Sequence, residues 1–561
     1  MLTKLKLIGL GSFEKWVYPA EQESSIDGDL LPLDAHMFPL LQVLIIRKCP
    51  KLLGLPFSNH ITSTDWFPKL QVLELRDCPE FLPVIPISWI GSLHSVMMKC
   101  VEMLNAFEYS KSFDRAVLEI LAEDDLHTLD QVLVFDKEIG LEHLVLERCP
   151  PLELKHLLML TSLKILFVQH SDCWFGPLGG QADVEWQLPV AHMRIWDLNG
   201  NSGEELTELL PHLPNLSKLK IIECKSIKQL VVGLNVQQTT SEAAAEEEDG
   251  GMLAFPADLC DSLQELEFFG CPELVLVDPP MLQALRSLQR LCIMNTPKFI
   301  STFLFTRHIF PSSLQFLQLW GVEGLETGAP LKPLFPYWIR CREDLKCQGL
   351  QFLLTTGGKL NELTVLGSRR FFDGWDPNPI CALEDAEGGE EQQTWLVSST
   401  LQKLCTDHVE GGLLAAPICG ILSSSLTELK LWSQGVGERF SKEEEDALLL
   451  LSSIQQLEFQ RCNFLQQLPA GLSNLTSLKR LSIYACQAVS SLPINGFPKS
   501  LQELDVRFSN KELIQQCRGL TYTSFVPIHC AAQCLGSSPV HSFSLVELFL
   551  FHTNTSATCM T

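Results

Sequence analysis

Apolar residues recur along this chain at the first, fourth and sixth positions of a short repeat, whose fullest form is Leu-x-x-Leu-x-Leu-x-x-Cys-Pro. This form occurs as LQVLIIRKCP at residues 41–50, LQVLELRDCP at 70–79 and LEHLVLERCP at 141–150. We number each repeat from its first leucine. Positions 4 and 6 alternate with outward residues, which predicts a short strand that buries one face.

Looser copies begin at Leu2 and continue to Leu545, often 22 to 28 residues apart, with a degraded copy at Leu93. A larger step, such as the 47 residues from Leu216 to Leu263, indicates an insertion or a repeat too divergent to recognise. A repeat this short cannot bury its apolar face alone and must stack on its neighbours. The pattern predicts an α/β solenoid, a leucine-rich-repeat horseshoe with a parallel concave β-sheet and an irregular, partly helical convex side.

Breaks in the pattern suggest the domain organisation. We expect an irregular leucine-rich-repeat solenoid over residues 1–510, with acidic, low-complexity inserts at 239–251 and 384–393 that form mobile loops on the convex side. The repeat is lost over 511–544, which we interpret as an irregular insertion, and residues 545–561 supply a last repeat strand and a tail.

Two local signals add detail to this outline. Ser441 and Glu444 match a capping box ahead of an apolar run, which predicts the start of a helix. Seven of the twenty cysteines fall at position 9, where the chain leaves the strand and the side chain points inward. A compact residue with a weak S–H donor suits this slot, so one reused position explains these cysteines better than disulfide pairing. They are Cys49, Cys78, Cys149, Cys224, Cys271, Cys462 and Cys486.

Composition narrows the classes of function. Hydrophobic residues make up 46% of the 561 residues, which favours a folded body. The net charge of −25 disfavours nucleic acid as the main ligand. Apolar runs are far shorter than the roughly 20 residues of a membrane span, and the amino terminus already lies in repeat register, so it is no signal peptide. We expect reduced thiols in a cytoplasmic protein that also reaches the nucleus or the periphery of the plasma membrane. Because the chain opens within the repeat, we expect it to be the later part of a longer protein.

The spacing, the cysteine slot and phrases such as LPAGLSNLTSLKRLSIYACQAVSSLPINGFPKSLQELDV at residues 468–506 resemble one family in particular. They look like the carboxy-terminal repeats of plant, especially grass, coiled-coil nucleotide-binding leucine-rich-repeat (NLR) disease-resistance proteins. The resemblance implies a recognition module of an intracellular immune receptor. Such a module senses pathogen effectors or modified host proteins and restrains a nucleotide-binding switch that lies outside this chain.

The switch itself is not recognisable in these residues. The nearest phosphate-loop string, Gly357-Gly358-Lys359-Leu360, lacks the first glycine spacing and the hydroxyl that holds magnesium. We therefore expect no cofactor in this chain, with ADP or ATP bound only by a domain upstream. The expected partners are proteins: an effector or guarded host protein, and the nucleotide-binding domain of the same receptor.

Outward positions 3, 5, 7 and 8 supply the candidate site. Large aromatic residues recur at position 7, and rigid aromatics are typical interface hot spots. The alternative is that neighbouring rings only pack on one another. Charged residues come second, and by resemblance an amino-terminal stretch could face the nucleotide-binding module. The predicted partner-binding residues are Trp196, Phe269, Trp320, Trp432, Tyr484, Phe551, Arg47 and Arg76.

Metal and catalytic chemistry have little sequence support. His529, Cys530, Cys534 and His541 offer four possible zinc ligands but no second cysteine pair, so we assign no metal site. Hydrolase, zinc-protease and redox motifs are absent, and we expect no enzyme.

Three other functions remain as alternatives. The chain could be a leucine-rich-repeat scaffold or substrate adaptor of a ubiquitin ligase, although residues 1–38 do not suggest the helix bundle that an F-box would need. It could be an extracellular repeat receptor, which would need a signal peptide, cysteine caps and a regular period. It could also be a receptor fragment that does not signal.

Overall fold

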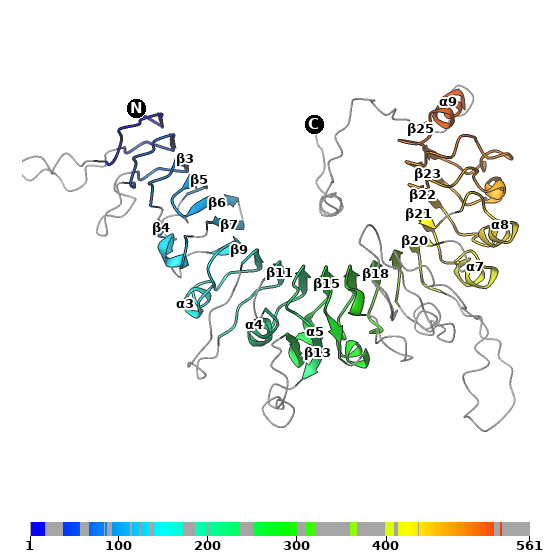
Figure 1. Ribbon diagram of the computed structural model, residues 1–561, viewed down its shortest axis with the longest axis horizontal. Helices are drawn as coiled ribbons and strands as arrows, with labels where there is room; N and C mark the ends of the chain where they lie inside the picture. The colour runs from blue at the N-terminus through cyan, green and yellow to red at the C-terminus, as the bar shows by residue number, and fades with distance from the viewer. Residues whose placement is uncertain are drawn as a thin grey trace, which may run out of the picture.

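The chain forms a curved solenoid whose strands line the inner face of an arch and whose helices lie on the outer face (Figure 1). The computed structural model describes residues 2–16, 38–55, 67–82, 85–86, 93–112, 115–123, 125–134, 140–171, 186–198, 202–234, 251–277, 279–299, 310–320, 359–366, 399–408, 413–435, 437–520 and 528–529.

One sheet of 20 strands runs through the described part of the arch. Its strands pair in parallel in chain order, except where the hairpin β6–β7 makes antiparallel pairs. They are β1 (Lys4–Ile8), β2 (Val43–Arg47), β3 (Val72–Cys78), β5 (Ser95–Val101), β6 (Leu104–Ser112), β7 (Arg115–Ala122), β9 (Leu141–Glu147), β10 (Ile165–Gln169), β11 (His192–Trp196), β12 (Lys218–Ile222), β15 (Glu265–Phe269), β17 (Arg290–Met294), β18 (Phe316–Trp320), β19 (Glu362–Leu366), β20 (Lys403–His408), β21 (Glu428–Gly435), β22 (Gln456–Gln460), β23 (Arg480–Tyr484), β24 (Glu503–Asp505) and β25 (Ile528–His529).

The remaining elements are short. Strands β13 (Gln229–Leu234), β14 (Met252–Pro256) and β16 (Val275–Leu276) form a small sheet, and β4 (Ile85–Pro86) pairs with β8 (Leu133–Val134). The helices are α3 (Leu154–Leu157), α4 (Ser202–Leu209), α5 (Ala257–Ser262), α7 (Ala416–Leu422), α8 (Lys442–Leu449) and α9 (Lys511–Leu520). Single 3-10 turns are η2 (Leu129–Gln131), η3 (Leu210–His212), η5 (Pro279–Ala284), η6 (Pro297–Phe299) and η9 (Ala470–Asn474).

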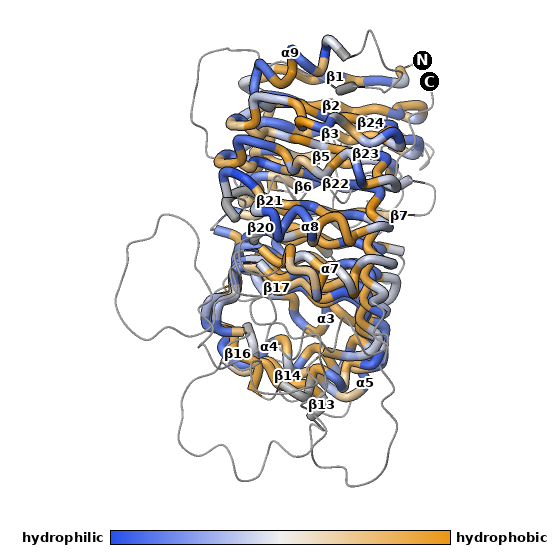
Figure 2. Tube along the Cα trace, turned by 90° about the vertical axis from the view of Figure 1, so that its right-hand side faces the viewer, coloured by the Kyte–Doolittle hydropathy of each residue, from blue (hydrophilic) through white to orange (hydrophobic). Residues whose placement is uncertain are grey.

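The predicted repeat register matches the strands. Every recognised repeat except the one that starts at Leu545, outside the described residues, gives a strand of the main sheet that begins near position 3. From β2 onward positions 4 and 6 are buried, as at Leu291 and Ile293 (both 0% exposed), and they stack from coil to coil into one continuous core. Hydrophobic positions therefore recur as bands along the stack in Figure 2. The prediction of a leucine-rich-repeat solenoid with a parallel concave sheet is confirmed.

In most of the described coils, position 8 forms a left-handed turn at or near the end of the strand. Its residue adopts a positive φ in successive coils, as in Glu223 (φ 56°) and Arg461 (φ 53°), where only glycine would be unstrained. The N–H of Glu223 donates to the carbonyl of Phe269 on the next strand at 2.7 Å, so the turn extends the inter-coil ladder by one bond. This turn aims position 9 into the core.

The cysteine slot lies where the sequence placed it. All seven position-9 cysteines are free thiols and at most 5% exposed. The thiol of Cys224 donates to the carbonyl of Ile222, two residues earlier, at 3.4 Å, and the others repeat this contact with their own position-7 carbonyls. Ser171 and Thr296 fill the same slot with a hydroxyl and the same bond, at 3.3 and 3.0 Å.

Larger steps between repeats have two structural causes. Between β5 and β9, the hairpin β6–β7 adds strands to the main sheet, and Leu118 and Ile120 of β7 take the buried positions 4 and 6. Between Leu216 and Leu263, strands β12 and β15 pair directly. The additional residues there supply β13 and β14 of the convex-side sheet, against which α4 packs.

The predicted helix start at Ser441 is confirmed. Ser441 Oγ accepts from the N–H of Glu444 at 3.2 Å, and the Glu444 carboxylate accepts from the N–H of Ser441 at 2.8 Å, which opens α8. Within segment 511–544, the structure describes α9 and β25, and β25 pairs with β24. The acidic insert 384–393, nearly all of insert 239–251 and the segment 545–561 lie outside the described residues.

Candidate functional site

The position-7 side chains of the middle strands form an apolar row on the concave face. In strand order from β11 to β21, aromatic and aliphatic residues alternate, and only Asp407 of β20 interrupts them. The aromatic rings are half-buried, whereas the aliphatic residues between them are at most 9% exposed. The large rings thus shield the smaller neighbours. We call this the central row: Trp196, Ile222, Phe269, Met294, Trp320, Leu366 and Trp432.

The two tryptophans at the end of the row touch across two strands. Their ring centroids are 6.2 Å apart with a 64° interplanar angle, although β19 and β20 separate the backbones of β18 and β21 by about 14 Å. Trp320 and Trp432 must therefore lean toward each other above Leu366, which is 4% exposed. The indole N–H of Trp432 is buried and has no hydrogen-bond partner among the described residues.

The other predicted aromatics are placed differently. Tyr484 on β23 is separated from the central row by Gln460 of β22, and its ring packs edge-on against Phe508 at 5.4 Å. Arg507 lies 6.0 Å from the Tyr484 centroid, which gives the carboxy-terminal end of the face a small cluster of its own. Phe551 lies outside the described residues.

The two predicted arginines share one carboxylate. Arg47 and Arg76 each lie 2.6 Å from Oε1 of Glu74, and their side chains are 41% and 39% exposed. Paired charges at this exposure contribute little free energy. The structure brings both arginines together on β2 and β3, far along the arch from the central row (Figure 1).

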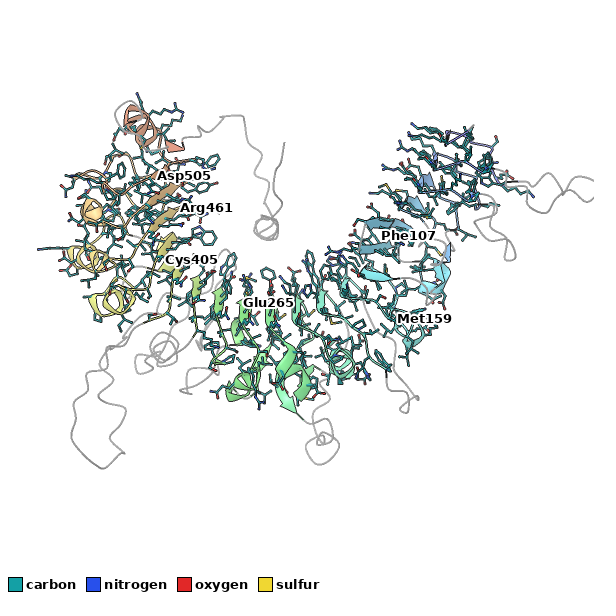
Figure 3. The ribbon with its side chains drawn as sticks, turned by 180° about the vertical axis from the view of Figure 1, so that it is seen from behind. Phe107, Met159, Glu265, Cys405, Arg461 and Asp505 are labelled. Atoms are coloured by element: carbon teal, nitrogen blue, oxygen red, sulfur yellow. The ribbon has the colours of Figure 1, made fainter. Side chains whose placement is uncertain are left out.

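Charge pairing of this kind continues along the concave face, where strand side chains project into the hollow, with Glu265 at its centre (Figure 3). Cations at positions 3, 5 and 7 approach carboxylates, mostly on an adjacent strand, to 2.6–3.6 Å. The pairs are Arg47 and Arg76 with Glu74, Lys99 with Glu108, Lys218 with Glu265, Lys220 with Glu267, Lys403 with Glu362, Lys430 with Glu428 and Glu458, Arg480 with Glu503, and Arg507 with Asp505.

Two arginines on these strands contact aromatic rings instead. The guanidinium carbon of Arg194 lies 5.9 Å from the Phe167 centroid and 5.2 Å from that of Trp196. Arg290 stacks over Phe316 at 3.6 Å. The sequence analysis considered aromatics only at position 7 and so missed these residues at positions 3 and 5. The same outward register would have found them.

Among the described residues, one cluster has the geometry of a metal site. Asp130, Glu153 and His156 bring three ligand atoms within 4.8 Å of one another. The N–H of Glu153 donates to Nδ1 of His156 at 3.2 Å, so Nε2 carries the proton and donates to Asp130 at 2.9 Å. Lys155 contacts both carboxylates, and its hydrogen bond lowers the pKa of Asp130. The cluster is internally satisfied and leaves no histidine lone pair for an ion. Of the four zinc-type residues noted in the sequence, only His529 is described, in β25.

Comparisons with known proteins give structural similarities alone. No family model matches the chain, and no curated protein matches it. A leucine-rich-repeat protein of Leptospira interrogans is 16% identical, with a TM-score of 0.36, over 82% of this chain and 90% of that one. The circular leucine-rich-repeat protein CroV588 is 14% identical, with a TM-score of 0.39, over 95% and 73%. An internalin of Listeria monocytogenes is 12% identical, with a TM-score of 0.27, over 74% and 82%.

The architecture is that of a protein-interaction module. Stacked repeats present a long, continuous concave surface that suits the binding of another protein. Among the described helices, none is long and apolar enough to cross a membrane.

Proposed function

We propose that this chain is the recognition module of an intracellular plant immune receptor of the NLR class. Its concave face binds a pathogen effector or a host protein that an effector has modified. The Cys-Pro repeats and the phrase at residues 468–506 support the family. The proposal gives this chain no catalytic step and places nucleotide binding in a domain outside it.

The central row is the observation that carries the proposal. Its half-buried rings sit on a rigid parallel sheet, so they lose little conformational entropy when a partner covers them. Trp320 and Trp432 support each other in one orientation, and the unpaired indole N–H of Trp432 could gain a hydrogen bond in a complex. Residues at interface hot spots are typically large and rigid and carry a group that can form a hydrogen bond.

We infer that the receptor is activated because its partner binds one form of the receptor more tightly than the other. In the resting receptor the solenoid would hold the nucleotide-binding module in its ADP form, and the partner would favour the released form that exchanges to ATP. A partner with equal affinity for both forms would shift nothing, however tightly it bound. The partner must therefore bind the central row more tightly in the released form than in the resting form.

The test is Trp320→Ala with Trp432→Ala in the receptor, co-expressed in leaves with a panel of pathogen effectors. Loss of two hot-spot rings, at about 2 kcal/mol or more each, predicts at least a ~100-fold weaker complex and loss of the effector-dependent cell death. Phe464→Ala is the matched control, because Phe464 is 58% exposed but follows position 9 of its coil, off the concave strands. A normal response from a double variant that accumulates and folds would refute the proposed role of the row.

A further inference from the structure

Two arginines on the strands of the concave face have no carboxylate partner. From β2 to β24, each described cation at position 3, 5 or 7 has a carboxylate within 4.0 Å, except Arg194 and Arg290. The exceptions lie in the middle of the arch, on β11 and β17, beside the central row. Between β2 and β24, these two are therefore the described cations at positions 3, 5 and 7 that no carboxylate neutralises.

The charged guanidinium of Arg194 is partly buried and so partly shielded from water. Burial lowers its pKa, with Glu267 opposing the shift from a distance, and its Nε is buried without a hydrogen-bond partner among the described residues. Phe167 and Trp196 contact the guanidinium, and His143 extends the cluster by packing edge-on against Phe167 at 5.1 Å. Burial also lowers the pKa of His143, which keeps that ring neutral near pH 7. An arginine held by rings and lacking an anion is prepared to bind one.

Arg290 repeats the arrangement in a more open position. Its side chain is exposed, and the ring of Phe316 supports it from below. The strand order β11–β12–β15–β17 puts the two arginine backbones three strand spacings apart. The register aligns Arg194 with Cys292, two residues after Arg290, so the backbones are about 16 Å apart. Between them, Lys218 and Lys220 are neutralised by Glu265 and Glu267, so the two arginines are separate points of charge.

We propose that the middle of the concave face binds an acidic segment of a partner protein, with Arg194 and Arg290 each donating to a carboxylate. The inference rests on the proposed recognition function and names the chemistry of its partner. An extended segment rises about 3.3 Å per residue, so acidic side chains roughly five residues apart would match the spacing of the two arginines. Apolar side chains of the same segment would cover the central row alongside.

The arrangement favours a peptide carboxylate over a nucleic acid. The interposed Glu265 and Glu267 would oppose a continuous phosphate backbone, which carries a charge at every step, more than a segment with two separated carboxylates. Two separated guanidinium groups, each backed by a ring, instead fit discrete planar anions, for which an arginine fork gives two parallel hydrogen bonds.

The experiment selects random peptides displayed on phage against the whole chain and measures their affinity by fluorescence polarisation. We expect the selected sequences to be enriched in Asp and Glu next to aromatic or aliphatic residues. Arg194→Met keeps the apolar contact with Phe167 and Trp196 but removes the charge, and should weaken these peptides roughly 10- to 100-fold. Arg194→Lys keeps the charge without the planar fork and should fall between Arg194→Met and the wild type.

Arg480→Met is the matched control. Like Arg290, Arg480 is at position 3 of a concave strand, but it is paired with Glu503 at 2.6 Å. The peptides should therefore bind this variant as they bind the wild type. If Arg194→Met does not fold, Arg290→Met, at an exposed side chain, tests the same point. Selected peptides without acidic enrichment, equal binding to folded Arg194→Met or Arg290→Met, or no selected peptides at all would overturn the inference.

Failure of this inference is distinguishable from failure of the proposed function. Arg194→Met can be tested in the same leaf assay as the paired tryptophan variant. An effector response that needs Trp320 and Trp432 but not Arg194 would leave the recognition function in place and exclude the acidic partner. A response that needs neither would exclude both.

Discussion

At the scale of single residues, one buried slot explains seven of the twenty cysteines. Position 9 needs a small side chain that fills the space behind the left-handed turn and donates to the carbonyl two residues earlier. Cysteine satisfies both needs in seven coils, and Ser171 and Thr296 satisfy them elsewhere. The slot selects for size and a donor, so the cysteines at position 9 reflect the repeat and not redox chemistry.

The slot predicts how stability depends on pH. Burial raises the pKa of Cys149 to about 12 and that of Cys224 to about 11, from an ordinary value of 9.0. Above pH 9 the unfolded chain releases thiol protons that the folded chain retains. The free energy of unfolding should therefore be fully present below pH 9 and fall as the pH rises toward 11 and 12.

Urea unfolding at a series of pH values from 8 to 11 measures this loss. The variant Cys149→Ser with Cys224→Ser should show a shallower decline, because serine does not titrate in this range and Ser171 shows that the slot accepts it. An identical decline in the variant would mean that other groups, such as tyrosines and lysines, cause the loss.

At the scale of elements, the strands and helices are too short to persist alone. Most strands of the main sheet have five residues and α8 has eight, and isolated helices of this length are marginal in water. Their stability comes from the neighbouring coils and from local caps. The capping box of α8 gives hydrogen-bond partners to N–H groups at the start of the helix. The first turn of α8 carries Glu443, Glu444 and Glu445, whose negative charges interact favourably with the positive end of the helix dipole.

Removing the cap should loosen this coil. Ser441→Ala leaves the N–H of Glu444 without its acceptor and should lower the free energy of unfolding by about 1 kcal/mol. Ser452→Ala is a suitable control, because that exposed hydroxyl makes only a long bond to the carbonyl of Ser423, 3.3 Å, and caps no helix. Thermal unfolding followed by circular dichroism compares the two, and equal stability of Ser441→Ala and the wild type would contradict the role of the box.

At the scale of the whole molecule, each coil contacts mainly the coils before and after it. Stability is then a sum of coil and interface contributions, so a defect in the middle weakens the solenoid on both sides. Leu291 lies in the centre and is completely buried, whereas Leu5 on the edge strand β1 occupies the same repeat position but is half-buried.

Truncation at these two sites should have unequal effects. Leu291→Ala should lower stability by about 2–5 kcal/mol and raise hydrogen exchange in both flanking coils. Leu5→Ala should have a smaller effect, confined to β1 and β2, because its core face is already partly open. Hydrogen exchange read by mass spectrometry measures the spread, and equal, global effects of both variants would show that the arch unfolds as a single unit.

The sequence by itself determined the repeat, its register and the class of fold. Period-2 alternation over positions 4 to 6 assigns inside and outside for each strand, and stacking of identical coils leaves little choice in how they pair. The same logic located the cysteine slot and the start of α8. It also identified which side chains face the hollow, because that depends only on backbone alternation.

Only the tertiary structure decided what those outward side chains do. The contact of Trp320 with Trp432 crosses two strands and depends on the curvature of the sheet and on the small Leu366 between them. Whether a cation is neutralised or stacked on a ring often depends on the residue beside it in an adjacent coil. Lys218 pairs with Glu265, 47 residues later in the sequence, and Arg194 contacts Phe167, 27 residues earlier. The hairpin β6–β7 and the convex sheet of β13 and β14 could not be predicted from the sequence either. Non-local strand pairing, and not local alternation, determines where an insertion packs.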